Sequence, residues 1–135
     1  MSHWRRNIKK FALIYLISQF LLTEPELYFI EPQDKAIISG PVKVVFGLKD
    51  FGVAPAGYNI NNTGHHHLLI NVDFPIDFTK PIPADSNHIH FGKGQTETIL
   101  DLPKGEYRLR LLLGNYVHIP HSNPIYSEEI LITVN

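Results

Sequence analysis

Short runs in which apolar residues alternate with polar ones are the feature that most constrains how this chain can fold. The clearest run covers residues 106–113, where Tyr107, Leu109 and Leu111 alternate with charged side chains. Successive side chains of a β-strand point to opposite faces of its sheet, so such a run predicts a strand with one buried face. Roughly seven runs of this kind, separated by turns rich in Gly, Pro and Asn, predict an all-β fold, a single immunoglobulin-like antiparallel β-sandwich.

The segment from Leu102 to Tyr107 gives a more specific indication of topology. It places a turn containing Gly105 before a tyrosine that begins the penultimate predicted strand. This arrangement is typical of the tyrosine corner of immunoglobulin-like sandwiches. An ordinary hairpin with a half-buried tyrosine explains the same residues, and the sequence leaves both interpretations open.

The first 22 residues differ from the rest of the chain. Four basic residues between Arg5 and Lys10 precede the apolar run FALIYLISQFLL at 11–22. A basic region followed by about a dozen apolar residues is typical of a signal peptide, and it is shorter than the roughly 20 residues that a transmembrane helix needs. We predict a signal peptide or N-terminal membrane anchor at 1–23 and a β-sandwich domain at 24–135, exported to the periplasm or cell envelope. A buried amphipathic helix is the alternative for the leader.

Composition excludes several classes of function. The chain has no cysteine, which rules out thiolate zinc, iron–sulfur and blue-copper sites, so transition-metal chemistry must use imidazole and carboxylate groups. After residue 22 there are 8 Lys and Arg against 13 Asp and Glu. This balance offers no basic field, so we expect no nucleic-acid partner. We expect membrane contact only through the N-terminal segment, if that segment stays uncleaved.

The histidines form two His-x-His pairs, His65 with His67 and His88 with His90. Residues i and i+2 of a strand share a face and lie about 6.5–7 Å apart, so two imidazoles at this spacing can converge on one metal ion. In both pairs the apolar neighbours alternate with the histidines, which predicts that the pairs project from the side of the sheet away from the core. His66 continues an apolar face instead and is interpreted as a hydrogen-bonded core residue.

Two further histidines, His118 and His121, lie in the turn-rich segment NYVHIPHSNP and can close over a site formed by the pairs. Asn71, Asp73 and Asp85 are candidate oxygen ligands, or partners that hold a ligating ring in position. Nitrogen ligation suits copper(II), zinc or nickel, and copper(II) leads by intrinsic affinity. The candidate metal ligands are therefore His65, His67, His88, His90, His118 and His121.

These patterns predict an exported His-rich β-sandwich that binds a divalent transition metal, copper(II) or zinc, without catalysis. One alternative is an immunoglobulin-like interaction module with a partner protein in the envelope, whose histidines form a structural or pH-responsive network. A second alternative is a zinc-dependent hydrolase, in which three histidines leave one position open for water. Catalysis is not supported, because the sequence has no HExxH motif and no second carboxylate placed for acid–base chemistry. No catalytic residue is assigned.

The same residues resemble a bacterial envelope family, domain-of-unknown-function family DUF4399, over nearly all of residues 28–135. The matching stretches are NTGHHHLLI at 62–70, PIPADSNHIHFGKGQTET at 81–98, LLLGNYVHIPH at 111–121 and SEEILITV at 127–134. The resemblance implies an exported single domain with a shared His-rich feature, and it implies no established activity. Members of the family usually carry Asp where this chain has Asn115, so a carboxylate that bound or oriented a ligand there would be lost.

A weaker resemblance is to the CopC-like copper-binding β-sandwiches of the periplasm. They also have a turn with glycine and tyrosine before a late strand and a histidine in the following loop, which would correspond here to Gly105, Tyr107 and His118. This similarity is one of fold, and it does not by itself imply copper binding.

Overall fold

The computed structural model describes residues 23–135, so all but the last residue of the leader predicted at 1–23 lies outside the described residues. Regular structure in the described part is entirely β, as the alternation predicts. No helix long and apolar enough to cross a membrane occurs among residues 23–135. The strands are β1 (Glu26–Glu31), β2 (Ile37–Ile38), β3 (Val42–Lys49), β4 (Gly52–Val53), β5 (Thr63–Ile70), β6 (His88–His90), β7 (Glu97–Leu100), β8 (Gly105–Gly114) and β9 (Ile130–Val134).

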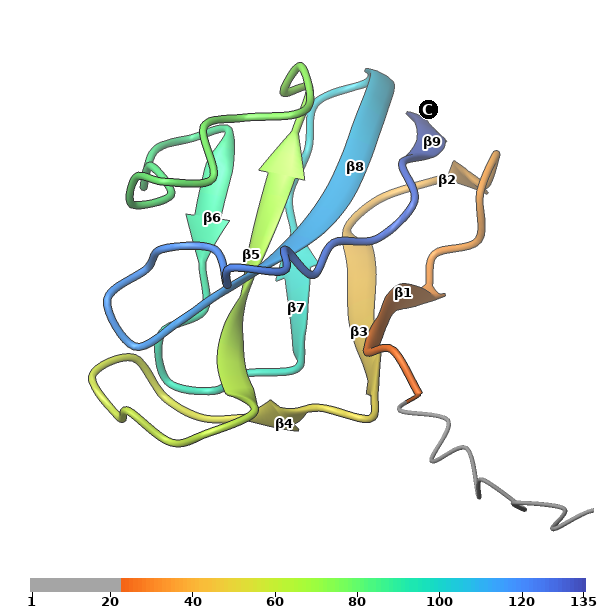
Figure 1. The fold of residues 1–135 in the computed structure, drawn as a ribbon. Helices are drawn as coiled ribbons and strands as arrows, with labels where there is room; N and C mark the ends of the chain where they lie inside the picture. Colours follow the sequence, from red (N-terminus) through yellow and green to blue (C-terminus); the bar gives the residue numbers. More distant parts are fainter. Residues whose placement is uncertain (1–22) are drawn as a thin grey trace, which may run out of the picture.

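The strands form two sheets (Figure 1). One sheet has the order β1-β3-β7, and the other has the order β2-β9-β8-β5-β4, with β6 also pairing with β5. The longer strands pair antiparallel, whereas the two-residue strands β2 and β4 pair in parallel with β9 and β5. This division of strands is that of an immunoglobulin-like sandwich, with β1, β3 and β7 in one sheet and β5, β8 and β9 in the other.

The main hydrophobic core lies between the two sheets. Alternate residues of β3, including Val42, Val44 and Phe46, pack against alternate residues of β8 and β9, among them Leu111 and Ile132. All five are at most 4% exposed. Full burial of an aliphatic or aromatic side chain stabilises a fold by about 1.5–3 kcal/mol, so these alternating runs hold the sheets together as predicted.

The predicted tyrosine corner is present. Tyr107, near the start of β8, donates a hydrogen bond from its hydroxyl to the carbonyl oxygen of Pro103, at 2.6 Å. Gly105 between them has a φ of 154°, which other residues rarely adopt. The bond ties the turn to the strand, and the ordinary-hairpin interpretation is therefore wrong.

Strand β5 is buried on both faces, whereas the sequence predicted a strand with only one buried face. Its even-numbered residues, such as Leu68, face the core between the sheets, whereas Leu69 packs with Ile82 and Leu112 in a second apolar cluster on the opposite face. The chain between β5 and β6 joins the chain between β8 and β9 over this face, where the Ile82 amide donates to the carbonyl oxygen of His118. The odd-numbered face of β5 is therefore covered by loops.

Candidate metal centre

The pairing of β5 with β6 brings the two His-x-His pairs together. His67 lies directly opposite His90 in the antiparallel register, and His65 is two residues before His67 on the same face of β5. Side chains directly opposite in such a pair have Cβ atoms about 4.5–5.5 Å apart. The hydrogen-bonding register of the backbone therefore places three imidazoles side by side.

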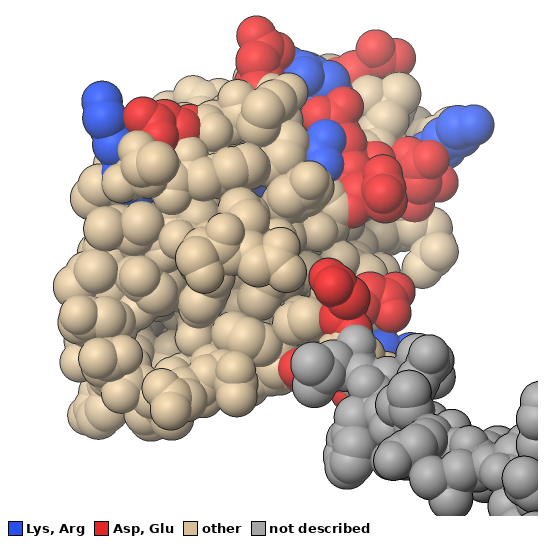
Figure 2. Space-filling view, in the orientation of Figure 1, with Lys and Arg blue, Asp and Glu red and all other residues tan. Residues whose placement is uncertain are grey.

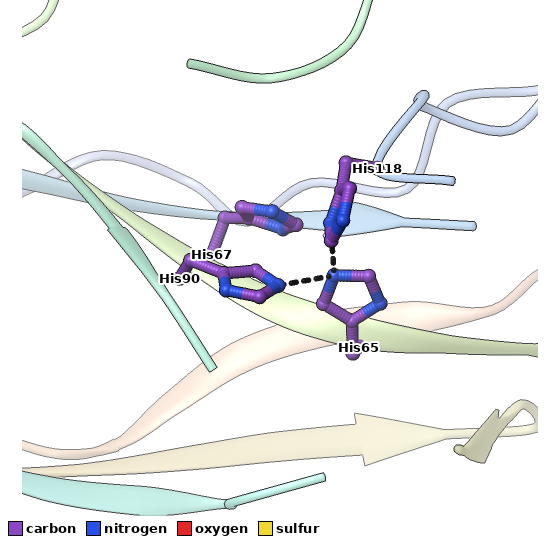
Figure 3. A group of neighbouring side chains, drawn as sticks. All are labelled: His65, His67, His90 and His118. Atoms are coloured by element: carbon purple, nitrogen blue, oxygen red, sulfur yellow. Dashed lines mark hydrogen bonds between the residues drawn. The ribbon is translucent and has the colours of Figure 1, made fainter. Parts of the chain in front are cut away.

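A fourth imidazole, that of His118, comes from the segment between β8 and β9. The Oδ1 atom of Asn115 accepts hydrogen bonds from the amides of Val117 and Ile119, both at 3.0 Å, and the carbonyl of Asn115 accepts from the His118 amide at 3.0 Å. His118 itself has a φ of 66°, a left-handed conformation that turn residues adopt. This tight turn aims the ring of His118 at the histidines of β5 and β6 (Figure 3).

The four imidazoles converge. Nε2 of His65 lies 3.1 Å from Nδ1 of His118 and 3.1 Å from Nε2 of His90. One ring nitrogen from each of His65, His67, His90 and His118 lies within 4.8 Å of the others. Ligands at about 2.0–2.1 Å around a tetrahedral ion are about 3.3–3.4 Å apart, so small ring movements would accommodate an ion.

With neutral imidazoles, the ring nitrogens of this cluster cannot all form hydrogen bonds. A ring nitrogen of neutral histidine carries either one hydrogen or one lone pair, so Nε2 of His65 can only share that single group between His90 and His118. Nδ1 of His65 and Nδ1 of His67 are buried and have no hydrogen-bond partner among the described residues. Buried polar atoms are normally hydrogen-bonded, so this shortage requires an explanation.

Burial keeps the rings of His65, His67 and His90 neutral near pH 7. His65 and His67 are each 1% exposed. Burial, together with the neighbouring rings of the cluster, lowers the pKa of His65 to about 4 and the pKa of His67 to about 3. Burial and the nearby His118 also lower the pKa of His90. Neutral imidazoles have the free lone pairs that metal ligation requires, so the cluster does not need to lose protons before it can bind an ion.

Two glycines leave room for the rings. A Cβ atom added to Gly114, which lies opposite His65 in β8, would come within 2.7 Å of Cε1 of His67. A Cβ atom added to Gly92 would collide with the ring of His90. Sequence reasoning assigned no site role to either glycine. The signal that could have found Gly92 is its position two residues after His90, because residues at this spacing share one side of an extended chain.

Two of the predicted ligands do not join the cluster. His88 lies two residues before His90 in β6, opposite Leu69, and its Nδ1 pairs with a carboxylate oxygen of Asp85 at 2.8 Å. His121 donates from Nε2 to the carbonyl oxygen of Thr63 at 2.9 Å. These contacts hold both rings away from the other four.

The predicted oxygen ligands also have other partners. Oδ1 of Asn71 accepts a hydrogen bond from the amide of Arg108, and Asp73 pairs with the guanidinium of the same arginine at 3.2 Å. Asp85 pairs with His88. Among residues 23–135, the group with metal-binding geometry consists of histidines alone.

His66 is a core residue, as predicted, but it is not hydrogen-bonded. It is fully buried, and its ring packs 4.9 Å from that of Phe46, measured between centroids. Neither ring nitrogen has a partner within the described part of the chain. Burial lowers the pKa of His66 to about 4. The prediction of a hydrogen-bonded core histidine is therefore wrong, because the surrounding side chains are apolar.

A family model described as a domain of unknown function (DUF4399) matches residues 44–135. The comparison with curated proteins found no match. A solved structure, the X-ray structure of the endo-beta-1,4-mannanase from Thermotoga petrophila, is 20% identical with a TM-score of 0.47. The similarity covers 83% of this chain and 20% of that protein, so the chain spans about a fifth of its length.

Proposed function

The chain belongs to the DUF4399 family, and from the site it carries we propose that it binds one divalent transition-metal ion, copper(II) or zinc, without catalysing a reaction. The proposed ligands are His65, His67, His90 and His118. The observation that carries the proposal is the position of Nε2 of His65, 3.1 Å from ring nitrogens of both His90 and His118.

An ion would remove the conflict at Nε2 of His65, whose single hydrogen or lone pair would otherwise be shared between His90 and His118. Each of the four rings can direct one lone pair at a central cation, while its other nitrogen carries the proton. No ring then has to share a hydrogen between two neighbours. Because His65, His67 and His90 are neutral and the four rings already face one another, little energy is needed to deprotonate those three or to reorient the rings.

The donor set favours borderline metals. Imidazole nitrogen suits copper, zinc and nickel, whereas calcium and magnesium prefer oxygen ligands. Among the divalent ions of the first transition row, copper(II) has the highest intrinsic affinity for nitrogen ligands. Zinc is the other candidate, because it accepts four ligands in a tetrahedron. Export through the leader predicted at 1–23 would place this site in the periplasm or cell envelope, in the domain at 24–135.

Metal content measured by mass spectrometry tests the proposal. The untagged protein is incubated with copper(II) or zinc, freed of excess ion and analysed, and we expect close to one equivalent per chain. His90→Ala should lower the affinity at least about tenfold, because one of four ligands is lost. His88→Ala is the matched control, since it removes an imidazole from the same strand but outside the cluster. Equal binding by both variants would show that the cluster is not the site.

A hydrogen-bonded histidine network is the competing function for the same residues, because two ring-to-ring contacts of 3.1 Å exist without an ion. The two functions differ in their response to added metal. A ligand present at 100 times its dissociation constant stabilises the folded state by about 2.7 kcal/mol, so copper or zinc should raise the melting temperature. An unchanged melting temperature would favour the network and an interaction role in the envelope.

A further inference from the structure

The segments that supply the cluster carry no charged side chains. Residues 51–72, which include β5, residues 86–92, which include β6, and residues 111–127, which include His118, contain no Asp, Glu, Lys or Arg. Figure 2 shows the result as a broad face without charged residues, while the charged side chains gather toward the top and right of the view. Residues 1–22 contain no acidic residue either.

Three carboxylates that lie close in sequence to these segments, Asp73, Asp85 and Glu129, have cationic or imidazole partners. Asp85 pairs with His88 at 2.8 Å, and Asp73 pairs with Arg108 at 3.2 Å. Glu129 lies 3.6 Å from Arg108 and 3.8 Å from Arg110. Because the cluster contains no carboxylate, a divalent ion held by its four neutral imidazoles would keep its full double positive charge.

The cluster is closed on one side and open on the other. His65 and His67 lie beneath the loops at 1% exposure, whereas His90 is exposed and His118 is half-buried. Beside His90, Gly92 contributes no side chain, and beside His118 the exposed residues are Tyr116 and Val117. Solvent species would reach the ion past His90 and His118.

We propose that the metal ion at this site takes a small, singly charged anion from solvent as a further ligand, on the His90 and His118 side. This inference rests on the proposed metal-binding function. An uncompensated double charge beside uncharged protein attracts an anion strongly, because the effective dielectric constant there is lower than that of water. Copper(II) accepts ligands beyond four nitrogens, and four-coordinate zinc can expand to five.

Azide is a suitable probe, because its binding to copper(II) produces a ligand-to-metal charge-transfer band. The full-length protein is first loaded with copper(II), and its copper content is measured. Azide is then titrated while absorption and electron paramagnetic resonance spectra are recorded. We expect a saturable new band, a changed resonance spectrum, retention of the copper, and competition by chloride.

A charge series at Val117 tests where the anion binds. This side chain is 43% exposed and adjoins His118, so it can be changed without altering the core or a ligand. Relative to Val117→Gln, we expect Val117→Lys to tighten azide binding and Val117→Glu to weaken it, each by about two- to fivefold at low ionic strength.

The outcomes separate the two proposals. If neither copper(II) nor zinc binds stoichiometrically, the proposed function fails and the anion site fails with it. If copper binds but a large excess of azide leaves both spectra unchanged, metal binding stands and the anion inference is overturned. Removal of copper by azide would also overturn the inference, because it shows competition with the protein instead of a shared complex. Identical azide affinities across the Val117 series would overturn its location.

Discussion

Replacing His66 by leucine should stabilise the metal-free protein, and the gain should grow as the pH falls. His66 is fully buried beside Phe46, and neither ring nitrogen has a hydrogen-bond partner among the described residues. Leaving a buried polar group unsatisfied costs about 1–3 kcal/mol. Leucine is similar in size and apolar, so we expect His66→Leu to gain about 1 kcal/mol at pH 7.5 after repacking losses.

The pH dependence follows from the lowered pKa of His66. Its pKa is about 4 in the folded protein, against 6.5 for an unperturbed histidine. Between these values the unfolded chain binds a proton that the folded protein does not, so the free energy of unfolding decreases as the pH falls from 6.5 toward 4. At pH 5 the lowered pKa of His66 reduces the free energy of unfolding of the wild type by about 2 kcal/mol. His66→Leu should recover this loss in addition to the gain at pH 7.5.

Urea unfolding followed by circular dichroism at pH 7.5, 6 and 5 measures both effects. The metal-free wild type is expected to lose stability over this range more steeply than His66→Leu, because only the wild type contains His66. His65 and His67 remain in both proteins and therefore contribute equally to both pH profiles. Metal affinity should be unchanged, since His66 faces the opposite side of β5 from the cluster. A variant that is less stable than the wild type at pH 5, or that shows the same pH slope, would refute the reasoning.

Three further changes test how the cluster and the fold are held. Gly92→Ala should displace the ring of His90 and lower metal affinity about tenfold or more by calorimetry, without a comparable loss of stability. Asn115→Ala removes the acceptor of two amides in the turn that positions His118, so calorimetry should show weaker metal binding and urea unfolding a loss of about 1–2 kcal/mol. Tyr107→Phe should cost about 1 kcal/mol in urea and leave metal affinity unchanged; unaltered stability would contradict the tyrosine corner.

The alternation of apolar and polar residues was sufficient to predict the sandwich, because the strands of the main core each direct alternate apolar residues toward the other sheet. It could not predict that β5 is buried on both faces, since the covering residue Ile82 comes from a loop without periodicity. Local spacing likewise paired His65 with His67, and His88 with His90, as candidate metal ligands.

Spacing could not separate His88 from His90, because both lie on the same face of β6. The register decides between them by pairing His90 with His67 and His88 with Leu69. Register depends on contacts between residues far apart in the sequence, and a single sequence does not specify them. The contribution of His118 depends in the same way on the turn made by Asn115.

Because the four histidines lie far apart along the chain, an ion bound to them would cross-link distant segments. His65 is separated by 25 residues from His90 and by 53 residues from His118. An ion bound to all of them would act as a cross-link that closes two long loops in a chain without cysteine. Closing loops of this size in the unfolded chain costs about 3–4 kcal/mol of conformational entropy when the cross-link is a disulfide. A metal cross-link can also be released and reformed, so the availability of the ion would set how firmly the β8–β9 segment is held against β5.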